Sequence, residues 1–247
     1  MTRSSLSAPK AEAPAFLTAR PFAHRGLHGQ GRSENGMAAF DAAIAEGLGI
    51  ECDVRASRDG TAIIFHDATL ARMAGRDEAV ADLSAADLAE RSLPDGGAVP
   101  SLAALLTRCG GTTPLLVEVK VDSGPADPLC RAVARDLAAW PGAPVAVMSF
   151  NPRVGRWLAR HAPGIVRGLV VTEQGKGRLR GAIERALALW IAKPDFLACD
   201  IRDLPSPFTT RARRRGLPVL SWTVRSQEQR ARAARHADQI IFERTDG

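Results

Sequence analysis

Residues 145–171 read VAVMSFNPRVGRWLARHAPGIVRGLVV, two short apolar runs with a helical pattern between them. Residues 145–150 and 165–171 have the length and valine content of buried strands. Within residues 153–161, apolar side chains recur at helical spacing. A strand, a helix and a second strand in this order predict two parallel strands joined by a helix.

The same alternation extends toward both ends of the chain. Predicted strands lie at residues 21–26, 48–54, 115–120, 145–150, 165–171, 196–201, 217–224 and 239–242, with an additional extended run at 61–65. Eight such units in about 225 residues predict an α/β protein with a single (β/α)8 TIM barrel. The alternative is a doubly wound open sheet, which usually carries a glycine-rich loop after its first strand. Here that strand ends in His24-Arg25-Gly26 instead.

The composition is that of an ordinary globular protein. Of 247 residues, 45% are hydrophobic and 24% are charged, which excludes a collagen, a coiled coil and a mostly disordered chain. We expect residues 1–20 to form a flexible N-terminal arm and residues 21–247 to form one barrel domain. The arm lacks the apolar core of a signal peptide, and no apolar run approaches the ~18 residues of a membrane span.

The net charge of +6 comes almost entirely from arginine. We interpret this as a coding bias with a solvated charged surface, in preference to a nucleic-acid-binding surface. No two cysteines have CxxC spacing, which argues against a zinc site or a disulfide framework. These features predict a cytoplasmic protein.

Three acidic side chains lie near predicted strand ends. Glu51 and Asp53 are two residues apart on one strand, so they point to the same side. Glu118 lies on the next strand, and the carboxyl ends of barrel strands meet at one mouth. Converging carboxylates repel one another, and a hard divalent cation, Mg²⁺ or Ca²⁺, would relieve that repulsion. The alternative is that each acid pairs with a nearby arginine or lysine; the E-x-D pair beside an E-x-K strand favours a metal.

Two histidines, His24 and His66, also lie at predicted strand ends. Imidazole titrates near neutral pH, so such a pair can act as general base and general acid. Arg25 offers a planar donor fork and Lys120 a point charge, and both suit a phosphate group. Because no G-x-S-x-G nucleophile motif is present, the set favours phosphodiester cleavage over acyl transfer. We expect Asp67 to orient His66 by a hydrogen bond.

Several short motifs stand in the order and spacing of a known family. They are HRG at 24–26, SENG at 33–36, ECDV at 51–54, DG at 59–60, FHD at 65–67, VPSL at 99–102, EVK at 118–120, SF at 149–150 and WTV at 222–224. From about residue 21 to the C-terminus, the chain resembles the glycerophosphodiester phosphodiesterase family.

This resemblance implies a TIM barrel of the PLC-like phosphodiesterase type, with a short insertion after the second strand at residues 68–98. It implies hydrolysis of small glycerophosphodiesters to an alcohol and sn-glycerol 3-phosphate with one divalent cation. The implied site residues are Glu51, Asp53 and Glu118 for the metal, His24 and His66 for acid–base catalysis, Arg25 and Lys120 for the phosphate, and Glu34 and Trp222 for the pocket lining.

The chain departs from the family pattern at a few positions. The family usually has proline and threonine where Ser33 and Gly36 flank Glu-Asn, and asparagine where Arg225 follows Trp-Thr-Val. It usually ends the last strand in Thr-Asp, where this chain has Phe242-Glu243. We expect these changes to lie away from the metal and acid–base groups and to alter only the rim of the pocket.

Residues 178–192 predict a basic amphipathic helix. Its apolar stripe, formed by Leu179, Ile183, Leu187 and Trp190, has arginines beside it and could dock on anionic lipid. The favoured interpretation is an outer barrel helix whose polar face is solvated. We therefore expect no stable membrane insertion and no nucleic-acid partner.

Two alternative functions stay open at this point. One is a lysophospholipase D, which keeps the chemistry and changes the substrate to a lysophospholipid. The other is a basic barrel that binds membranes or nucleic acid without turnover. His28 lies outside the matched motifs and is expected to be a surface group without a partner.

Overall fold

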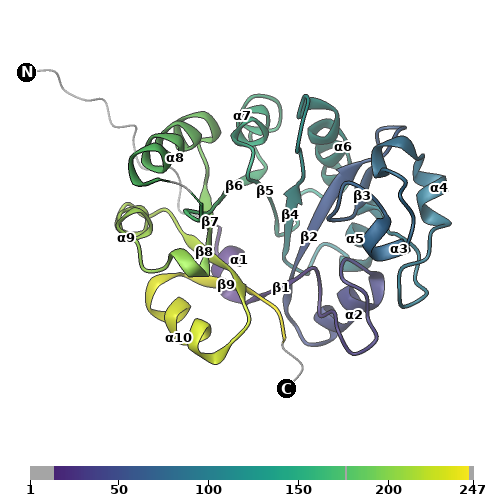
Figure 1. The fold of residues 1–247 in the computed structure, drawn as a ribbon, viewed down its shortest axis with the longest axis horizontal. Coiled ribbons are helices and arrows are strands. Elements are labelled where there is room, and N and C mark those ends of the chain that lie inside the picture. The colour runs from purple at the N-terminus through teal and green to yellow at the C-terminus, as the bar shows by residue number, and fades with distance from the viewer. Residues whose placement is uncertain (1–13, 176, 245–247) are drawn as a thin grey trace, which may run out of the picture.

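The computed structural model describes residues 14–175 and 177–244. Eight parallel strands form a closed barrel in the order β1-β9-β8-β7-β6-β5-β4-β2, and β1 also pairs with β2 (Figure 1). They are β1 (Phe22–His24), β2 (Gly49–Ala56), β4 (Leu115–Val119), β5 (Val145–Ser149), β6 (Val166–Val171), β7 (Phe196–Asp200), β8 (Val219–Val224) and β9 (Gln239–Phe242). The closed sheet confirms the predicted TIM barrel and rules out the doubly wound alternative.

Helices cover the outside of the barrel (Figure 1). They are α2 (Met37–Ala45), α5 (Leu102–Cys109), α6 (Asp127–Ala138), α7 (Pro152–His161), α8 (Arg178–Ala192), α9 (Pro207–Arg214) and α10 (Gln227–His236). Serine side chains cap several N-termini: Ser101 accepts a hydrogen bond from the amide of Ala104, and Ser226 forms a capping box with Gln229. Among the described residues, no helix combines the length and apolar character needed to cross a bilayer.

Alternating side chains of the strands fill two apolar layers. On β2, Ile50, Cys52 and Val54 face the helices, whereas the intervening residues face the barrel axis. The lower interior is filled by large rings, including those of Phe22 and Phe196. Glycines on neighbouring strands make room for these rings, since a Cβ at Gly49 would lie 2.5 Å from Phe22 and one at Gly168 would lie 2.3 Å from Phe196.

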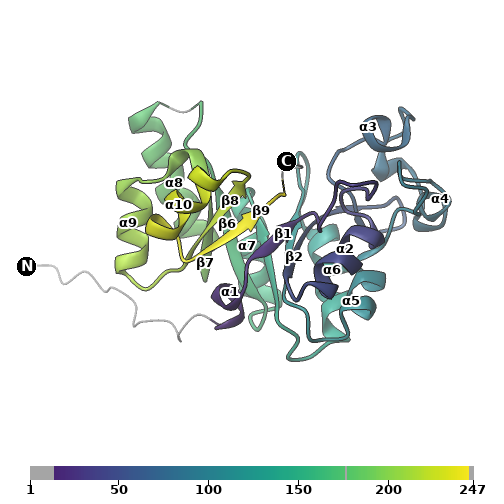
Figure 2. The ribbon, with the colours of Figure 1, turned by 90° about the horizontal axis from the view of Figure 1, so that it is seen from below.

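A short helix closes the bottom of the barrel (Figure 2). Helix α1 (Phe16–Ala19) buries Leu17 completely in the same apolar cluster as Phe22 and Ile241. This differs from the flexible arm expected over residues 1–20; residues 1–13 of that arm lie outside the described residues. Burial of one leucine against the open end of the barrel accounts for the difference, because it removes apolar surface from water.

The insertion after β2 has a small apolar core of its own. Strand β3 (Ala62–Ile64) pairs antiparallel with β2, and α3 (Ala71–Ala74), a 3-10 turn (Val80–Asp82) and α4 (Ala85–Ala89) follow it. The apolar cluster beneath these elements is formed by Ile63, Phe65, Leu70, Val80, Leu88, Leu93 and Val99. This packed unit fixes the segment that carries His66.

Helix α8 has the opposite orientation to the one expected from the sequence. Its apolar stripe faces solvent: Leu179 is 77% exposed and Trp190 is 71% exposed. The helix lies on the outside of the barrel as expected and polar side chains such as Arg180 are solvated, but the exposure of the apolar stripe was not expected. The side that faces the barrel includes the buried small residues Gly181 and Ala192 together with Leu189, and the side chains of the stripe remain outside.

We expect Gly168→Ala to destabilise the protein by about 1–3 kcal/mol, because the new methyl group overlaps the buried ring of Phe196. Urea unfolding measures the loss. Gly164→Ala is the matched control, since a Cβ there meets no atom within 4 Å. Equal unfolding midpoints for the two variants would contradict the packing described for the barrel interior.

Candidate active site

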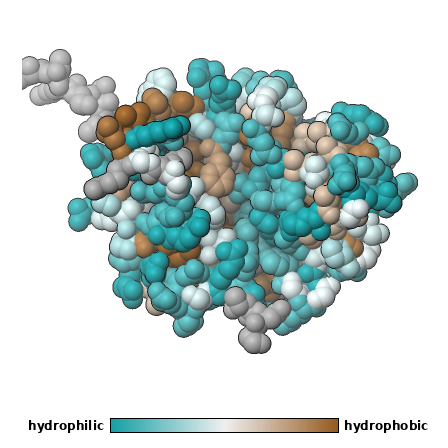
Figure 3. All heavy atoms as spheres, in the orientation of Figure 1, coloured by the Kyte–Doolittle hydropathy of each residue, from teal (hydrophilic) through white to brown (hydrophobic). Residues whose placement is uncertain are grey.

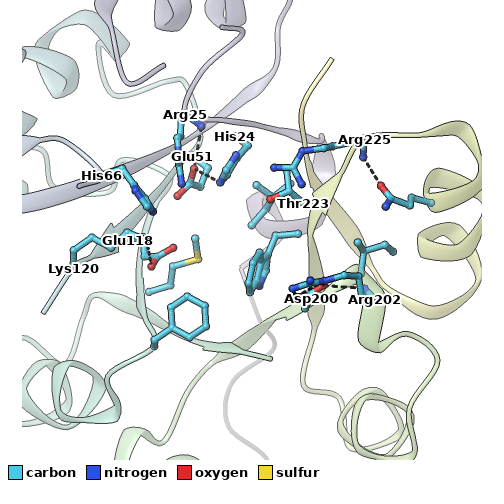
Figure 4. Close-up of a pocket in the computed structure, with 16 residues that line it drawn as sticks. His24, Arg25, Glu51, His66, Glu118, Lys120, Asp200, Arg202, Thr223 and Arg225 are labelled. Carbon is cyan, nitrogen blue, oxygen red and sulfur yellow. Dashed lines mark hydrogen bonds and ion pairs between the residues drawn. The ribbon is translucent and has the colours of Figure 1, made fainter. Parts of the chain in front are cut away.

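A cavity of about 380 Å³ opens at the carboxyl ends of the barrel strands (Figure 4). Its lining includes most of the residues predicted from the sequence, namely His24, Arg25, Glu51, His66, Glu118, Lys120 and Trp222. Catalytic groups of TIM barrels lie at this end of the strands because several loops converge there. The cavity is thus the place to test the predicted chemistry.

Three buried carboxylates converge at the base of the cavity. The strand register sets Glu51 beside His24 and Asp53 beside Glu118. One oxygen of each of Glu51, Asp53 and Glu118 lies within 4.8 Å of the others, and the residues are only 1%, 1% and 7% exposed. The convergence predicted from the spacing is therefore present.

Two cationic side chains compensate part of this negative charge. Lys120 places Nζ 2.5 Å from Oε1 of Glu118 and 3.0 Å from Oδ1 of Asp53, and Arg25 places Nε 3.0 Å from Oδ2 of Asp53. Burial opposes ionisation of Asp53, but Lys120 and Arg25 outweigh it and hold the pKa of Asp53 well below its usual range. The pairing alternative considered for the sequence is thus realised for Asp53 and Glu118.

Glu51 is left with much less compensation. Its Oε2 accepts a hydrogen bond of 3.0 Å from the backbone amide of Arg25, whereas its Oε1 has no hydrogen-bond partner among the described residues. Burial, followed by the charges of Asp53 and Glu118, raises the pKa of Glu51 well above its usual range. Burial also raises the pKa of Glu118.

This donor set fits a divalent cation. The three carboxylates outnumber the two cationic side chains that contact them, and Arg25 also pairs with Glu34, while an unpartnered oxygen of Glu51 lies beside the other two acids. A dication held by Glu51, Asp53 and Glu118 would favour their ionised forms and offset the excess of negative charge. The result would suit a monoanionic ligand such as a phosphodiester.

His24 is held by a carboxylate from the last strand. Its Nδ1 lies 2.6 Å from Oε1 of Glu243, and its Nε2 lies 3.9 Å from Oε2 of Glu51. Arg225 in turn donates two hydrogen bonds, of 2.5 and 2.9 Å, to Glu243. Burial lowers the pKa of His24, and the contact with Glu243 opposes that shift.

The expectation that the changes at Arg225 and Glu243 lie away from the acid–base groups is therefore wrong. Closure of the barrel pairs β9 with β1, so the end of the last strand lies beside the end of the first. The sequence could have predicted this contact, because a closed barrel requires the last strand to lie beside the first. His28 was expected to have no partner, yet its Nε2 lies 3.9 Å from Oε1 of Glu243.

His66 is held by the insertion. Its Nδ1 lies 2.7 Å from Oδ1 of Asp67, as predicted, and Arg72 donates to the other oxygen of Asp67 at 2.6 Å. The backbone carbonyl of His66 accepts a 2.7 Å hydrogen bond from Arg55. Burial lowers the pKa of His66, and the imidazole points into the cavity (Figure 4).

Glu34 does not line this cavity, although the resemblance implied that it would. It accepts hydrogen bonds from Arg25 at 2.9 Å and from Arg72 at 2.6 Å, and so holds the guanidinium of Arg25 in place. The neighbouring Asn35, which had no assigned role, donates from Nδ2 to Oδ2 of Asp53 at 3.0 Å. It has φ of +56°, in the left-handed region that asparagine tolerates better than most residues.

The other side of the cavity combines apolar side chains with the charged groups of Asp200, Arg202 and Arg225. Met148, Phe150, Trp222 and Ile241 contribute to it, and the rings of Phe150 and Trp222 meet edge to face at 5.5 Å. The indole of Trp222 donates a 2.9 Å hydrogen bond to the carbonyl of Ala198, which fixes its orientation. A ligand in the cavity would therefore meet the carboxylates and histidines on one side, and a wall of mixed apolar and charged side chains on the other.

Comparisons with known proteins agree on one family. The sequence profile of the Glycerophosphoryl diester phosphodiesterase family matches residues 24–246. A protein of Mycobacterium tuberculosis named "Probable glycerophosphodiester phosphodiesterase 2" is 43% identical over 86 residues, which are 34% of this chain and 33% of that protein. The match thus spans about a third of this curated relative's length.

Solved structures show the same fold along nearly the whole chain. The glycerophosphodiester phosphodiesterase of Thermotoga maritima has a TM-score of 0.72 at 23% identity and covers 90% of this chain and 92% of its own. An Oleispira antarctica phosphodiesterase, solved in complex with the product sn-glycerol-3-phosphate, has a TM-score of 0.78 at 22% identity, with coverages of 92% and 94%.

We expect Glu243→Gln to lower the pKa of His24. The carboxylate at Nδ1 favours the imidazolium, so its removal leaves burial unopposed and moves protonation to lower pH. NMR titration of the imidazole Cε1 proton measures the midpoint, and Glu243→Asp should retain more of the native value. Glu46→Gln is the control, because Glu46 pairs with Arg244 and not with the site. An unchanged or raised midpoint in Glu243→Gln would contradict the assigned contact.

Proposed function

Because the chain belongs to the glycerophosphoryl diester phosphodiesterase family, we propose that it hydrolyses glycerophosphodiesters to an alcohol and sn-glycerol 3-phosphate. The observation that carries this proposal is one cavity that holds two carboxylate-bound histidines, three converging carboxylates and two cationic side chains. Hydrolysis of a phosphodiester needs compensation of the negative charge on phosphorus, which the cationic side chains and a cation held by the carboxylates would give. It also needs a proton acceptor and a proton donor, which the two histidines would provide.

The phosphate group would bind between the carboxylate cluster and the cationic side chains. Arg25 and Lys120 both line the cavity and supply donors for phosphoryl oxygens. Glu51, Asp53 and Glu118 would hold one divalent cation, Mg²⁺ or Ca²⁺, which when bound polarises the phosphoryl oxygens and offsets the charge of the transition state. Glu34 and Asn35 keep Arg25 and Asp53 in position through the hydrogen bonds described above.

The two histidines would move the protons. Glu243 holds Nδ1 of His24 and Asp67 holds Nδ1 of His66, so the opposite nitrogen of each ring remains for the substrate. One imidazole accepts a proton from the attacking water as the new oxygen–phosphorus bond forms. The other donates a proton to the departing alcohol as the old oxygen–phosphorus bond breaks. Burial lowers the pKa of both, which keeps a neutral base available near neutral pH.

Lysophospholipase D activity is the second candidate. It is favoured by the apolar side chains of Met148, Phe150, Trp222 and Ile241, which contribute to the cavity lining. Phe150 is 45% exposed at the mouth, where it could contact an acyl chain. The two candidates share the same reacting groups and differ only in what the apolar wall accommodates.

We expect turnover to require a divalent cation. Release of sn-glycerol 3-phosphate from glycerophosphocholine, glycerophosphoethanolamine and a lysophosphatidylcholine should be measured with Mg²⁺, with Ca²⁺ and after exhaustive chelation. Glycerophosphodiester turnover that disappears on chelation and returns with one cation is the expected result. Preference for the lysolipid would select the second candidate, and no hydrolysis with either cation would support a binding protein without turnover.

Calorimetry tests the carboxylate cluster separately. Glu51→Gln should weaken cation affinity by at least about tenfold, because it removes an anionic ligand. Glu46→Gln, an exposed carboxylate remote from the cluster, should leave the affinity unchanged. Equal affinities in the two variants would remove Glu51 from the proposed metal site.

We expect His24→Ala and His66→Ala each to lower kcat by about 10²–10⁴-fold while the fold persists, because general acid–base groups typically contribute that much. Steady-state kinetics and a thermal melt of each variant measure this. His236→Ala on α10 is the control and should retain wild-type turnover. A variant of His24 or His66 with near-wild-type kcat would exclude that residue from proton transfer.

A further inference from the structure

Helix α8 presents an apolar stripe to solvent. Leu179, Ile183, Leu187 and Trp190 follow one another at intervals of four, four and three residues, so they lie on one side of the helix, and each is more than half exposed. In Figure 3 they form the brown patch over the position of α8. Exposed apolar patches of this kind mark interaction surfaces more often than isolated residues do.

The stripe is not needed to attach α8 to the barrel. The opposite side of the helix packs closely on α7, where a Cβ at Gly155 would lie 2.9 Å from Ala192. Arg185 on the same inner side stacks on Phe208 of α9 at 5.3 Å from the ring centroid and lies 3.4 Å from Glu173. The stripe is therefore a second apolar face, additional to the one that the fold uses.

Helices α7 and α9 lie on either side of α8 (Figure 1), and both carry exposed arginines. Arg153, Arg156 and Arg160 lie along one exposed side of α7, and Arg211, Arg214 and Arg215 lie exposed on α9 and at its C-terminus. None of these six guanidinium groups pairs with a carboxylate within residues 14–175 and 177–244. A cavity of about 260 Å³ between α7 and α8 brings Trp190 together with Arg156 and Arg160.

We propose that α8, with the arginines of α7 and α9 beside it, docks the protein on the surface of an anionic phospholipid bilayer. Apolar side chains of an amphipathic helix enter the acyl boundary, and flanking arginines bind lipid phosphates. Trp190 suits such a surface because its ring is apolar and its indole N–H can meet the hydrated headgroups.

The chemistry of the face favours a bilayer over another protein. From Ala182 to Leu187 the most exposed residues are Ala182, Ile183, Ala186 and Leu187, which offer no hydrogen bond for a folded partner to match; the partly exposed carboxylate of Glu184 lies 2.8 Å from Arg180. A second copy of this chain would bring arginine rows of like charge together around the stripe. An anionic bilayer satisfies both the apolar stripe and the positive charge beside it.

Vesicle sedimentation with the full-length protein tests the proposal. We expect binding to vesicles of phosphatidylcholine mixed with phosphatidylglycerol, weaker binding at high ionic strength, and little binding to phosphatidylcholine alone. Ile183→Ser with Leu187→Ser should lower the partition coefficient by about tenfold or more. Arg156→Glu with Arg160→Glu should lower it by at least about 25-fold, since each basic residue near such a surface contributes roughly fivefold.

A matched control separates local charge from total charge. Arg108→Glu with Arg131→Glu changes the net charge equally but lies on α5 and α6, and it should retain most of the binding. Trp190 fluorescence gives an independent readout, because the other three tryptophans are buried or half-buried. A blue shift on anionic vesicles should vanish in Trp190→Phe while sedimentation persists.

Three outcomes would overturn the proposal. They are equal binding to neutral and anionic vesicles, an equal loss in the α5–α6 control, and concentration-dependent dimers that Ile183→Ser with Leu187→Ser abolishes. Hydrolysis of glycerophosphocholine without vesicles should be the same in all these variants, since none touches the cavity. Failure of docking is thus distinguishable from failure of the proposed hydrolysis.

Discussion

Three carboxylates buried at one end of the barrel impose the main electrostatic constraint on this molecule. Charges removed from water must be compensated locally, and the remaining groups of the site are arranged to provide that compensation. Lys120 bridges Glu118 and Asp53, while Arg25 reaches Asp53 from the first strand. Glu51 has the least compensation, because its Oε1 has no hydrogen-bond partner among the described residues, and a dication held there would supply the missing positive charge. A bound dication would allow a site built largely from acids to receive the negatively charged ester of the proposed reaction.

Barrel closure determines which residues can act together. The E-x-D pair and the E-x-K strand were readable from the sequence because side chains alternate along a strand and neighbouring strands end together. The contact between His24 and Glu243 joins the two ends of the chain, so it follows only from the pairing of β1 with β9. Motif spacing placed His24 in the site without its partner for this reason. The role of Asn35 was not predicted for a different reason. Its contact with Asp53 depends on a left-handed backbone conformation in a loop, which residue spacing does not reveal.

Helix orientation shows a second limit of sequence reasoning. Periodicity located α8 within its observed bounds, and it also identified the stripe of Leu179 and Trp190. It could not say which side meets the barrel, because small residues such as Gly181 and Ala192 form a close-packed inner face with little hydrophobic signal. The burial of Leu17 beneath the barrel was missed similarly, since one apolar residue in a polar stretch forms no pattern. Both errors arise where tertiary packing uses residues that carry weak periodic information.

The distribution of arginine gives the excess positive charge a location. A coding bias would raise the number of arginines over the whole chain. Around the cavity the arginines form ion pairs with carboxylates: Arg25 and Arg72 pair with Glu34, and Arg225 pairs with Glu243. The arginine rows on α7 and α9 have no such acids within the described residues, and they border the exposed stripe of α8. A coding bias alone would not place arginines without acidic partners beside the exposed apolar stripe of α8. The coincidence makes one side of the barrel a surface for anions, separate from the mouth where a single phosphate would bind.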